Sequence, residues 1–194
     1  KADVSQEEGI LATFEAADAM GTLSAVITNA GVGDTVGTID TFTYARVDRI
    51  VTLNLTAVII CCREAVKRMA QKFGGAGGSI INVSSAAAKL GGHGAFVDYA
   101  ATKGAIDTLT VGLALEWVGE GIRVNAVRPG VIITDFHASV GVPNRPAEVG
   151  PGLPMARAGT AEEVAEAISW LMSDQSSYTT GAILEVSGGR SIVP

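Results

Sequence analysis

The chain alternates between short, almost continuously apolar runs and longer stretches in which apolar residues recur every three or four positions. The apolar runs are rich in Val and Ile and cover residues 25–28, 79–83, 122–127 and 182–186. Such runs are typical of strands that are buried on both faces of a parallel sheet. The alternation therefore predicts an α/β fold in which helices cover a parallel sheet.

Helical periodicity is strongest at about residues 6–20, 44–72, 98–119 and from residue 160 onward. Two of these stretches open with the spacing of a capping box, Ser5 with Glu8 and Thr160 with Glu163. We expect the long helix over residues 44–72 to be broken near Asn54. Residues 135–159 are different, because they are rich in Pro and Gly and only weakly periodic. We interpret them as a mobile flap within a single domain that covers residues 1–194.

Charge and composition exclude several classes of protein. A net charge of -6 and a pI near 4.9 argue against a nucleic-acid-binding surface. No apolar run has the roughly 18 residues that a membrane span needs. Cys61 and Cys62 are adjacent and point in different directions on a helix, which fits free thiols in the cytoplasm. His93 and His137 are too isolated to predict a metal site.

One group of residues points to proton transfer. Tyr99 and Lys103 are four residues apart on a predicted helix, so their side chains share a face. A tyrosine with a pKa of about 10 needs roughly 4 kcal/mol of phenolate stabilisation to become a base near neutral pH. One cation about 4 Å away supplies energy of that order at an effective dielectric of 20. Ser85 follows a predicted strand and could donate a hydrogen bond to the substrate oxygen at the sheet edge where such folds bind ligands.

A series of motifs in a fixed order adds to this pattern. They are Thr28-Asn29-Ala30-Gly31, Asn54, Asn82-Val83-Ser84-Ser85, Tyr99-Ala100-Ala101-Thr102-Lys103, Ile122-Arg123-Val124-Asn125 and Arg128-Pro129-Gly130-Val131-Ile132-Ile133-Thr134. Over essentially its whole length the chain resembles the short-chain dehydrogenase/reductase family. It is most similar to uncharacterised bacterial oxidoreductases related to glucose dehydrogenases. The resemblance implies a Rossmann-type doubly wound sheet in three αβα layers.

The resemblance also implies roles for four residues. Tyr99 would exchange a proton with the reacting oxygen of an alcohol or carbonyl. Lys103 would hold the nicotinamide ribose and lower the pKa of Tyr99. Ser85, rather than Ser84, would hydrogen-bond the reacting oxygen. Asn54 would stabilise the helix break and anchor a water in a proton relay.

The implied cofactor is NAD or NADP, between which the sequence does not choose. The cofactor-binding residues implied by the resemblance, besides Tyr99 and Lys103, are Asp3, Val4, Asn29, Ala30, Gly31, Pro129, Gly130, Ile132 and Thr134. Thr28 stands where the family usually has an Asn. Phe96, Phe136, His137 and Met155 could line a pocket for the substrate.

The glycine-rich phosphate-binding turn of the family does not occur in this chain. In the family's strand order, 3-2-1-4-5-6-7, residues 1–4 would be the tail of an isolated strand. Residues 25–28 would then leave an apolar sheet edge exposed. We therefore expect a natural protein that is longer by some tens of residues, and weak dinucleotide binding by a chain that starts at Lys1.

The leading interpretation is an NAD(P)-dependent oxidoreductase that interconverts an alcohol and a carbonyl on a small polyol, sugar or keto substrate. Two alternatives stay open, a 3-oxoacyl thioester reductase and a non-catalytic dinucleotide-binding protein of the same fold. Beyond the substrate, we expect a homo-tetramer or dimer formed through the helices that contain Cys61 and Tyr99. Small residues on those helices permit such contacts, namely Ala57, Ala65, Ala105, Gly112 and Ala114.

Overall fold

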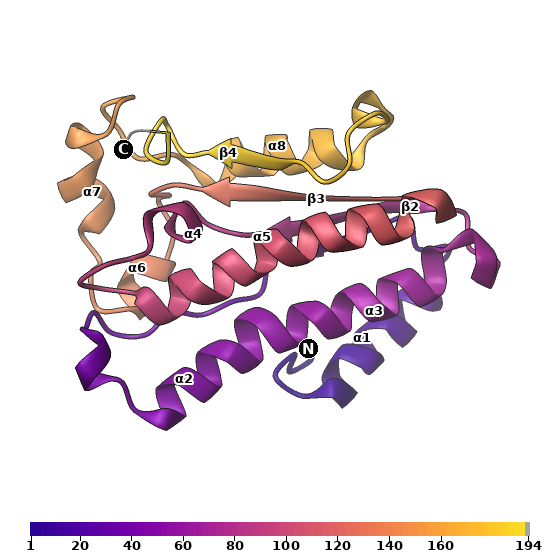
Figure 1. Cartoon of the computed structure of the whole chain (residues 1–194), viewed down its shortest axis with the longest axis horizontal. Coiled ribbons are helices and arrows are strands. Elements are labelled where there is room, and N and C mark those ends of the chain that lie inside the picture. Colours follow the sequence, from indigo (N-terminus) through magenta and orange to yellow (C-terminus); the bar gives the residue numbers. More distant parts are fainter. Residues whose placement is uncertain (193–194) are drawn as a thin grey trace.

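The computed structural model describes residues 1–192, and its described part contains a parallel sheet of four strands (Figure 1). The strands are β1 (Ala25–Thr28), β2 (Gly78–Val83), β3 (Ile122–Pro129) and β4 (Ile183–Val186), in that spatial order. In the register of the sheet, Ile80 of β2 lies between Val26 of β1 and Val124 of β3. All four predicted strands are confirmed to within two residues at each end.

Helices cover both faces of this sheet. The longer helices are α1 (Glu7–Asp18), α2 (Tyr44–Val51), α3 (Ala57–Met69), α5 (Val97–Trp117) and α8 (Ala161–Met172). Ile80 and Val124 pack into one core with α1, α3 and α5, whereas Ile81 and Val127 pack against α8 on the other face. Since neighbouring strand residues point to opposite faces, this alternation produces the predicted three-layer αβα arrangement.

The start of the chain differs from the prediction. Residues 1–3 have no regular structure and residues 4–5 form a turn, so the expected strand at residues 1–4 is wrong. The Asp3 side chain accepts a hydrogen bond from Ser5 N at 2.9 Å. Because this turn places Ser5 before the capping position, Gln6 occupies that position without a side-chain hydrogen bond. The predicted capping box of Ser5 and Glu8 is therefore wrong.

The second predicted capping box is confirmed. Thr160 Oγ1 accepts a hydrogen bond from Glu163 N, and Glu163 Oε2 accepts one from Thr160 N at 2.9 Å. The predicted break near Asn54 is also confirmed, as a π-helical turn (Thr52–Thr56) that joins α2 to α3.

The predicted exposed edge is β1, one of the two outermost strands of the described sheet. Ile27 in this strand is 42% exposed. A cavity of about 270 Å³ lies along β1, and Val4, Phe14 and Val58 are among the residues that line it. Apolar side chains thus remain accessible on this side of the sheet.

Residues 135–159 contain α6 (Phe136–Ser139), α7 (Arg145–Val149) and a 3-10 turn (Gly150–Gly152). These helices are too short to produce a readable period, which is why the sequence predicted only a flap. Backbone hydrogen bonds join the last residue of the segment to the residues just before its start: Gly159 N donates to Val131 O and Ile133 N donates to Gly159 O, both at 2.9 Å. We keep the name flap for residues 135–159.

The remaining elements are short. They are α4 (Ala87–Leu90) and 3-10 turns at Ile39–Thr41, Gln71–Phe73, Val118–Glu120 and Asp174–Ser176. None of the helices within residues 1–192 is long and apolar enough to cross a membrane.

Candidate active site

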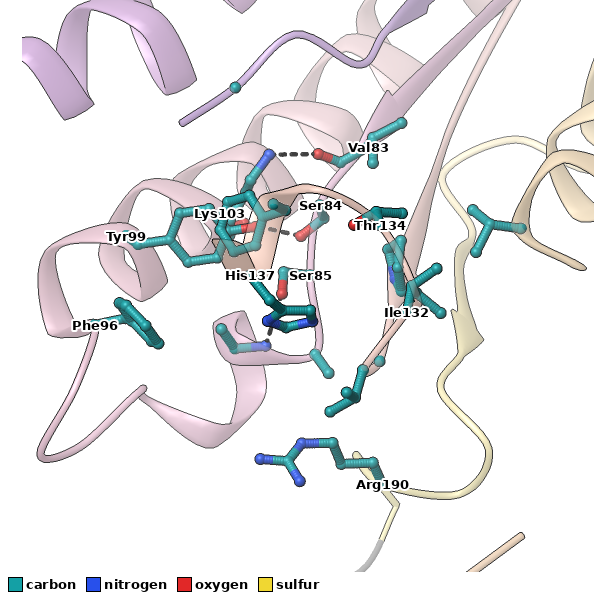
Figure 2. A pocket seen from close by; sticks show the side chains of 18 of the residues that line it. Val83, Ser84, Ser85, Phe96, Tyr99, Lys103, Ile132, Thr134, His137 and Arg190 are labelled. Carbon is teal, nitrogen blue, oxygen red and sulfur yellow. Dashed lines mark hydrogen bonds between the residues drawn. The ribbon is translucent and has the colours of Figure 1, made fainter. Parts of the chain in front are cut away.

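A cavity of about 660 Å³ opens at the carboxyl ends of the strands (Figure 2). Its walls come from the segments that follow β1, β2, β3 and β4, together with α5, α8 and the flap. This is the edge at which open α/β sheets bind ligands. Tyr99, Ser85 and Lys103 all line the cavity, as their positions in the sequence predicted.

The two adjacent serines have different surroundings. Ser84 is buried, and its hydroxyl donates to the Lys103 carbonyl at 3.1 Å. Ser85 is half-buried, and its hydroxyl accepts from Ala87 N at 3.1 Å, which leaves its own proton available. The Ser85 hydroxyl is also close enough to Tyr99 to influence the pKa of the phenol. This arrangement supports the choice of Ser85 over Ser84.

Lys103 is buried at the base of the cavity, with 4% of its surface exposed. Its ammonium donates to the Val83 carbonyl at 2.7 Å and lies 5.6 Å from the centroid of the Tyr99 ring. Burial lowers the pKa of Lys103 to about 8, while the negative charge of Asp107 opposes that shift. Lys103 and Tyr99 are therefore neighbours, as expected for residues four apart on α5.

Tyr99 itself departs from one expectation. Burial raises the pKa of the phenol above its ordinary value, and the Ser85 hydroxyl lowers it only in part. The pKa of Tyr99 is therefore not lowered overall in this geometry, in which the Lys103 ammonium donates to a backbone carbonyl. Stabilisation of the phenolate by Lys103 stays a prediction. The neutral phenol is the dominant form near pH 7.

Asn54 is fully buried in the π-helical turn and holds the loop that follows β1. Its side-chain oxygen accepts from Val32 N and its side-chain nitrogen donates to Val32 O, each at 2.8 Å. A Cβ added to Gly31 would lie 3.1 Å from Asn54 Oδ1 and 3.6 Å from Lys103 Nζ. The break in the helix thus brings Gly31, Asn54 and Lys103 together, and a larger residue at position 31 would fill the space between them.

A buried polar network lies below this loop. Thr28 Oγ1 donates to Asn82 Oδ1 at 2.7 Å, and Asn82 Nδ2 donates to Thr110 Oγ1 at 2.9 Å. Cys62 contributes a weaker contact to the same Asn82 oxygen, and burial raises the pKa of its thiol to about 12. Thr28 therefore supplies a donor across the sheet at the position where the family usually has an Asn.

The predicted cofactor-binding residues divide into two sets. Those that line the main cavity are Asn29, Gly31, Pro129, Gly130, Ile132 and Thr134, besides Tyr99 and Lys103. Val4 and Ala30 instead line the smaller cavity along β1, and Asp3 lines neither. The larger set could hold the nicotinamide half of a dinucleotide, and its glycines leave room for close approach of a ligand to the backbone.

Sequence reasoning missed an ion pair that supports the start of α5. Arg46 of α2 pairs with Asp98 at 2.7 Å, and both side chains are at least nine-tenths buried. Asp98 also accepts from Tyr99 N at 2.9 Å, while Arg46 donates to Thr35 O at 2.7 Å. The pair thereby fixes the backbone of Tyr99. The two residues are 52 positions apart, and only the fold brings them together.

Comparison with known proteins agrees with this geometry. A family model described as enoyl-(acyl carrier protein) reductase matches residues 1–191. The uncharacterized oxidoreductase YgfF of Escherichia coli (strain K12) is 52% identical over 191 residues, which are 98% of this chain and 77% of that protein. The chain belongs to the short-chain dehydrogenase/reductase family.

Two further relatives of this dehydrogenase/reductase chain have names that state different activities. Glucose 1-dehydrogenase 2 of Bacillus subtilis (strain 168) is 33% identical over 195 residues, covering 100% of this chain and 74% of that protein. The solved structure of a 3-ketoacyl-(acyl-carrier-protein) reductase from Brucella melitensis, complexed with NADH, superposes with a TM-score of 0.90. That match has 31% identity and covers 98% of this chain and 77% of the other. The predicted family and the predicted Rossmann-type fold are thus confirmed.

Proposed function

We propose that this oxidoreductase interconverts an alcohol and a carbonyl with NAD or NADP, and that Tyr99 is its acid and base. The observation that carries the proposal is the meeting of Tyr99, Ser85 and Lys103 in one cavity at the carboxyl ends of the strands. The apolar walls and the few convergent polar groups of this cavity suit a small organic substrate.

In the reducing direction, Ser85 donates a hydrogen bond to the carbonyl oxygen and holds it beside Tyr99. NAD(P)H, when bound, would supply the hydride that the carbonyl carbon accepts. The electron pair of the carbonyl π bond then takes the phenolic proton of Tyr99, which leaves an alcohol and a phenolate. Lys103 stabilises this phenolate by its charge, and the residues of the main cavity named above would hold the nicotinamide half of the cofactor.

The raised pKa of Tyr99 favours this direction near neutral pH, because the phenol carries the proton that the reduction consumes. Alcohol oxidation needs the phenolate of Tyr99. Because the pKa of this phenol is raised, the phenolate forms only at higher pH unless a further positive charge lies beside it.

A 3-oxoacyl thioester reductase is a second candidate, favoured by the superposition with the 3-ketoacyl-(acyl-carrier-protein) reductase of Brucella melitensis. The net charge of -6 works against docking of an acidic acyl carrier, so we rank a free small carbonyl compound first.

The test is the oxidation of NADH and NADPH by the purified protein across a panel of sugars, keto acids, cyclic ketones and 3-oxoacyl thioesters. Tyr99→Phe removes only the phenolic hydroxyl, and we expect it to lower kcat by about 10²–10⁴-fold. Tyr178→Phe is the matched control, because Tyr178 is fully exposed and lies outside the cavity. Equal rates for wild type and Tyr99→Phe would overturn the role of Tyr99. Cofactor binding without turnover of any carbonyl would favour the non-catalytic alternative.

We also propose that the protein assembles as a homo-tetramer or dimer in the cytoplasm. The small residues that were expected to permit contacts do not form one outward face, since Ala57, Ala65 and Ala114 are buried in the core of this chain. Larger exposed residues support the proposal instead, namely Ile59 on α3 with Val111 and Leu115 on α5. Both cysteines are free thiols, as a reducing compartment would keep them.

A further inference from the structure

Two arginines differ from all the others in this chain. Of its nine arginines, seven make side-chain hydrogen bonds or ion pairs within residues 1–192. Arg145 of α7 and Arg190, which follows β4, make none within that described range. Both line the main cavity. Arginines without a partner among residues 1–192, in a protein with an excess of acidic residues, point to a ligand that pairs with them.

The part of the cavity that the structure describes has no acidic counter-charge of its own. Its described lining residues include no Asp or Glu, although the chain has 20 of them. Its ionisable side chains, apart from Tyr99, are Lys103, Arg145, Arg190, His93 and His137. The cavity is therefore basic while the chain as a whole is acidic.

The basic groups are close enough to repel one another. Burial lowers the pKa of Arg190, and the positive charge of Arg145 lowers it further. Arg145 also contributes to the lowered pKa of His137, whose main cause is again burial. Positive charges held together in a partly desolvated space are unfavourable until an anion joins them.

His137 supplies an independent observation. Only 9% of the surface of His137 is exposed, and its Nδ1 has no hydrogen-bond partner within the described residues. A buried polar atom normally has a partner, so an unpartnered one inside a cavity marks a position where a ligand atom can bind. The imidazole donates a hydrogen bond from Nδ1 to an anion when that nitrogen carries a proton, either in the neutral Nδ1 tautomer or in the charged ring.

Aromatic contacts connect these groups to the reacting centre. The guanidinium of Arg145 lies 5.9 Å from the centroid of the Phe96 ring, three residues before Tyr99. The Phe136 ring lies 5.5 Å from that of Tyr99 and 5.8 Å from that of His137. In the view of Figure 2, His137 lies between Ser85 and Arg190.

We propose that Arg145, Arg190 and His137 form an anion-binding subsite, and that the substrate of this enzyme is a carbonyl or alcohol compound that carries a carboxylate. The planar guanidinium groups match the geometry of a carboxylate, which accepts two parallel hydrogen bonds from one arginine. The carboxylate takes no part in the reaction. It orients the substrate so that its carbonyl group meets Ser85 and Tyr99. This inference names the substrate class of the proposed function and rests on it.

The phosphates of the cofactor are a second source of the same negative charge. The two sources separate experimentally, because a cofactor role changes the binding of NAD(P)H, whereas a substrate role changes the preference between charged and neutral substrates.

The test compares keto acids with their primary amides, which keep the size and remove the charge. The pairs are 2-oxobutanoate, 3-oxobutanoate, 4-oxopentanoate and 5-oxohexanoate, each with its amide, so that the series also varies the distance from carbonyl to carboxylate. Wild type is compared with Arg145→Ala, Arg190→Ala and His137→Phe. Arg63→Ala is the matched control, because it removes the same charge at a half-buried position on α3, outside the cavity.

We expect wild type to prefer at least one acid over its amide by about tenfold or more in kcat/KM, as charge-assisted hydrogen bonds predict. Arg190→Ala and Arg145→Ala should remove most of this preference by lowering kcat/KM for the acid. The kcat/KM for the amide and the NAD(P)H Kd should stay within about twofold of wild type. Arg63→Ala should keep the preference. Equal kcat/KM for acids and amides in wild type would overturn the subsite. A raised NAD(P)H Kd with an unchanged preference would overturn it too, in favour of a phosphate-binding role.

A binding measurement separates failure of the subsite from failure of the proposed reaction. Saturation-transfer NMR with pentanoate and pentanamide needs no turnover. Selective binding of pentanoate that Arg190→Ala removes would support the subsite even if no carbonyl were reduced, and only the proposed reaction would then fail. The absence of selective binding, beside measurable reduction of neutral ketones, would reject the subsite and leave the reaction standing.

Discussion

At the scale of single residues, burial moves the pKa values of the two central groups in opposite directions. It raises the pKa of Tyr99 and lowers that of Lys103 to about 8. In both cases burial disfavours the charged form, and the result is a protonated acid beside a weakened cation. The Tyr99 phenol is therefore in the form that donates a proton rather than the form that accepts one.

This state predicts how activity depends on pH. The rate of alcohol oxidation should rise with pH throughout the alkaline range, because it needs the Tyr99 phenolate and the pKa of that group is raised. The rate of carbonyl reduction should stay high at neutral pH and fall as the phenol loses its proton. Initial rates in both directions from pH 6 to pH 10.5, with saturating cofactor, check this. Oxidation that is fastest below pH 7 would contradict the assignment.

The sequence alone located Ser85, Tyr99, Lys103 and Asn54, because each stands in a local motif with a characteristic spacing. It did not identify Arg145 or Arg190. Arg145 and Arg190 stand out because their side chains have no acidic partner among the described residues. The sequence could not show this, because the fold decides which side chains are neighbours. The direction of the Tyr99 pKa was also beyond the sequence, since it depends on how deeply the phenol is buried.

At the scale of elements, the closure of the flap depends on one glycine. A Cβ on Gly33, in the loop after β1, would lie 2.7 Å from Val140 Cγ1 and 3.1 Å from the Phe136 ring. Both contacts belong to the α6 region of the flap, and the Phe136 ring in turn contacts Tyr99. The absence of a side chain at position 33 lets the flap pack against the active site.

Gly33→Val should push α6 away from this loop. We expect kcat/KM to fall about tenfold, since overpacking of this kind costs about 1–3 kcal/mol. Hydrogen exchange should become faster in residues 135–142. Gly119→Ala is the control, because its added Cβ meets no atom within 4 Å. Unchanged exchange and kcat/KM in Gly33→Val would show that this contact does not hold the flap.

Element prediction succeeded where a pattern is long or strongly apolar. The β2 run from Ser79 to Val83 is such a case, as is the capping box at Thr160. It failed at Ser5, whose spacing to Glu8 is right but whose backbone lies in a turn closed by Asp3. It also failed for α6 and α7, because four or five residues complete little more than one turn and leave no repeat to detect.

At the scale of the whole molecule, a charge network attaches α1 to the rest of the structure. Glu64 of α3 is buried and accepts hydrogen bonds from Arg63, Lys67 and Arg68 at 2.8–2.9 Å. Arg63 reaches Glu7 and Arg68 reaches Asp18, at the two ends of α1. Burial alone would raise the pKa of Glu64, but the three hydrogen-bonded cations lower it to about 2.

A lowered carboxyl pKa stabilises the folded state above the unfolded value of 4.5, and this stabilisation is lost as the pH falls toward 2. Glu64→Gln should therefore reduce the free energy of unfolding at pH 7 by about 2–3 kcal/mol. The difference from wild type should shrink between pH 4.5 and pH 2. Urea unfolding at several pH values measures it, and a difference that stays constant down to pH 2 would contradict the network.

The π-helical turn at Thr52–Thr56 has a consequence for how this chain can change in length. A π turn contains one residue more than an α turn, so deleting one residue there yields a continuous α-helix without breaking the chain path. The deletion would leave α2 facing almost the same way relative to α3, because the wider π turn absorbs the extra residue. Arg46 would therefore still face Asp98, whereas the side chains inside the turn would change direction and position 54 would turn away from Val32. A single-residue deletion at this turn thus removes the support that Asn54 gives to the loop after β1 while the ion pair beside Tyr99 stays, so the extra residue of this helix belongs to the site.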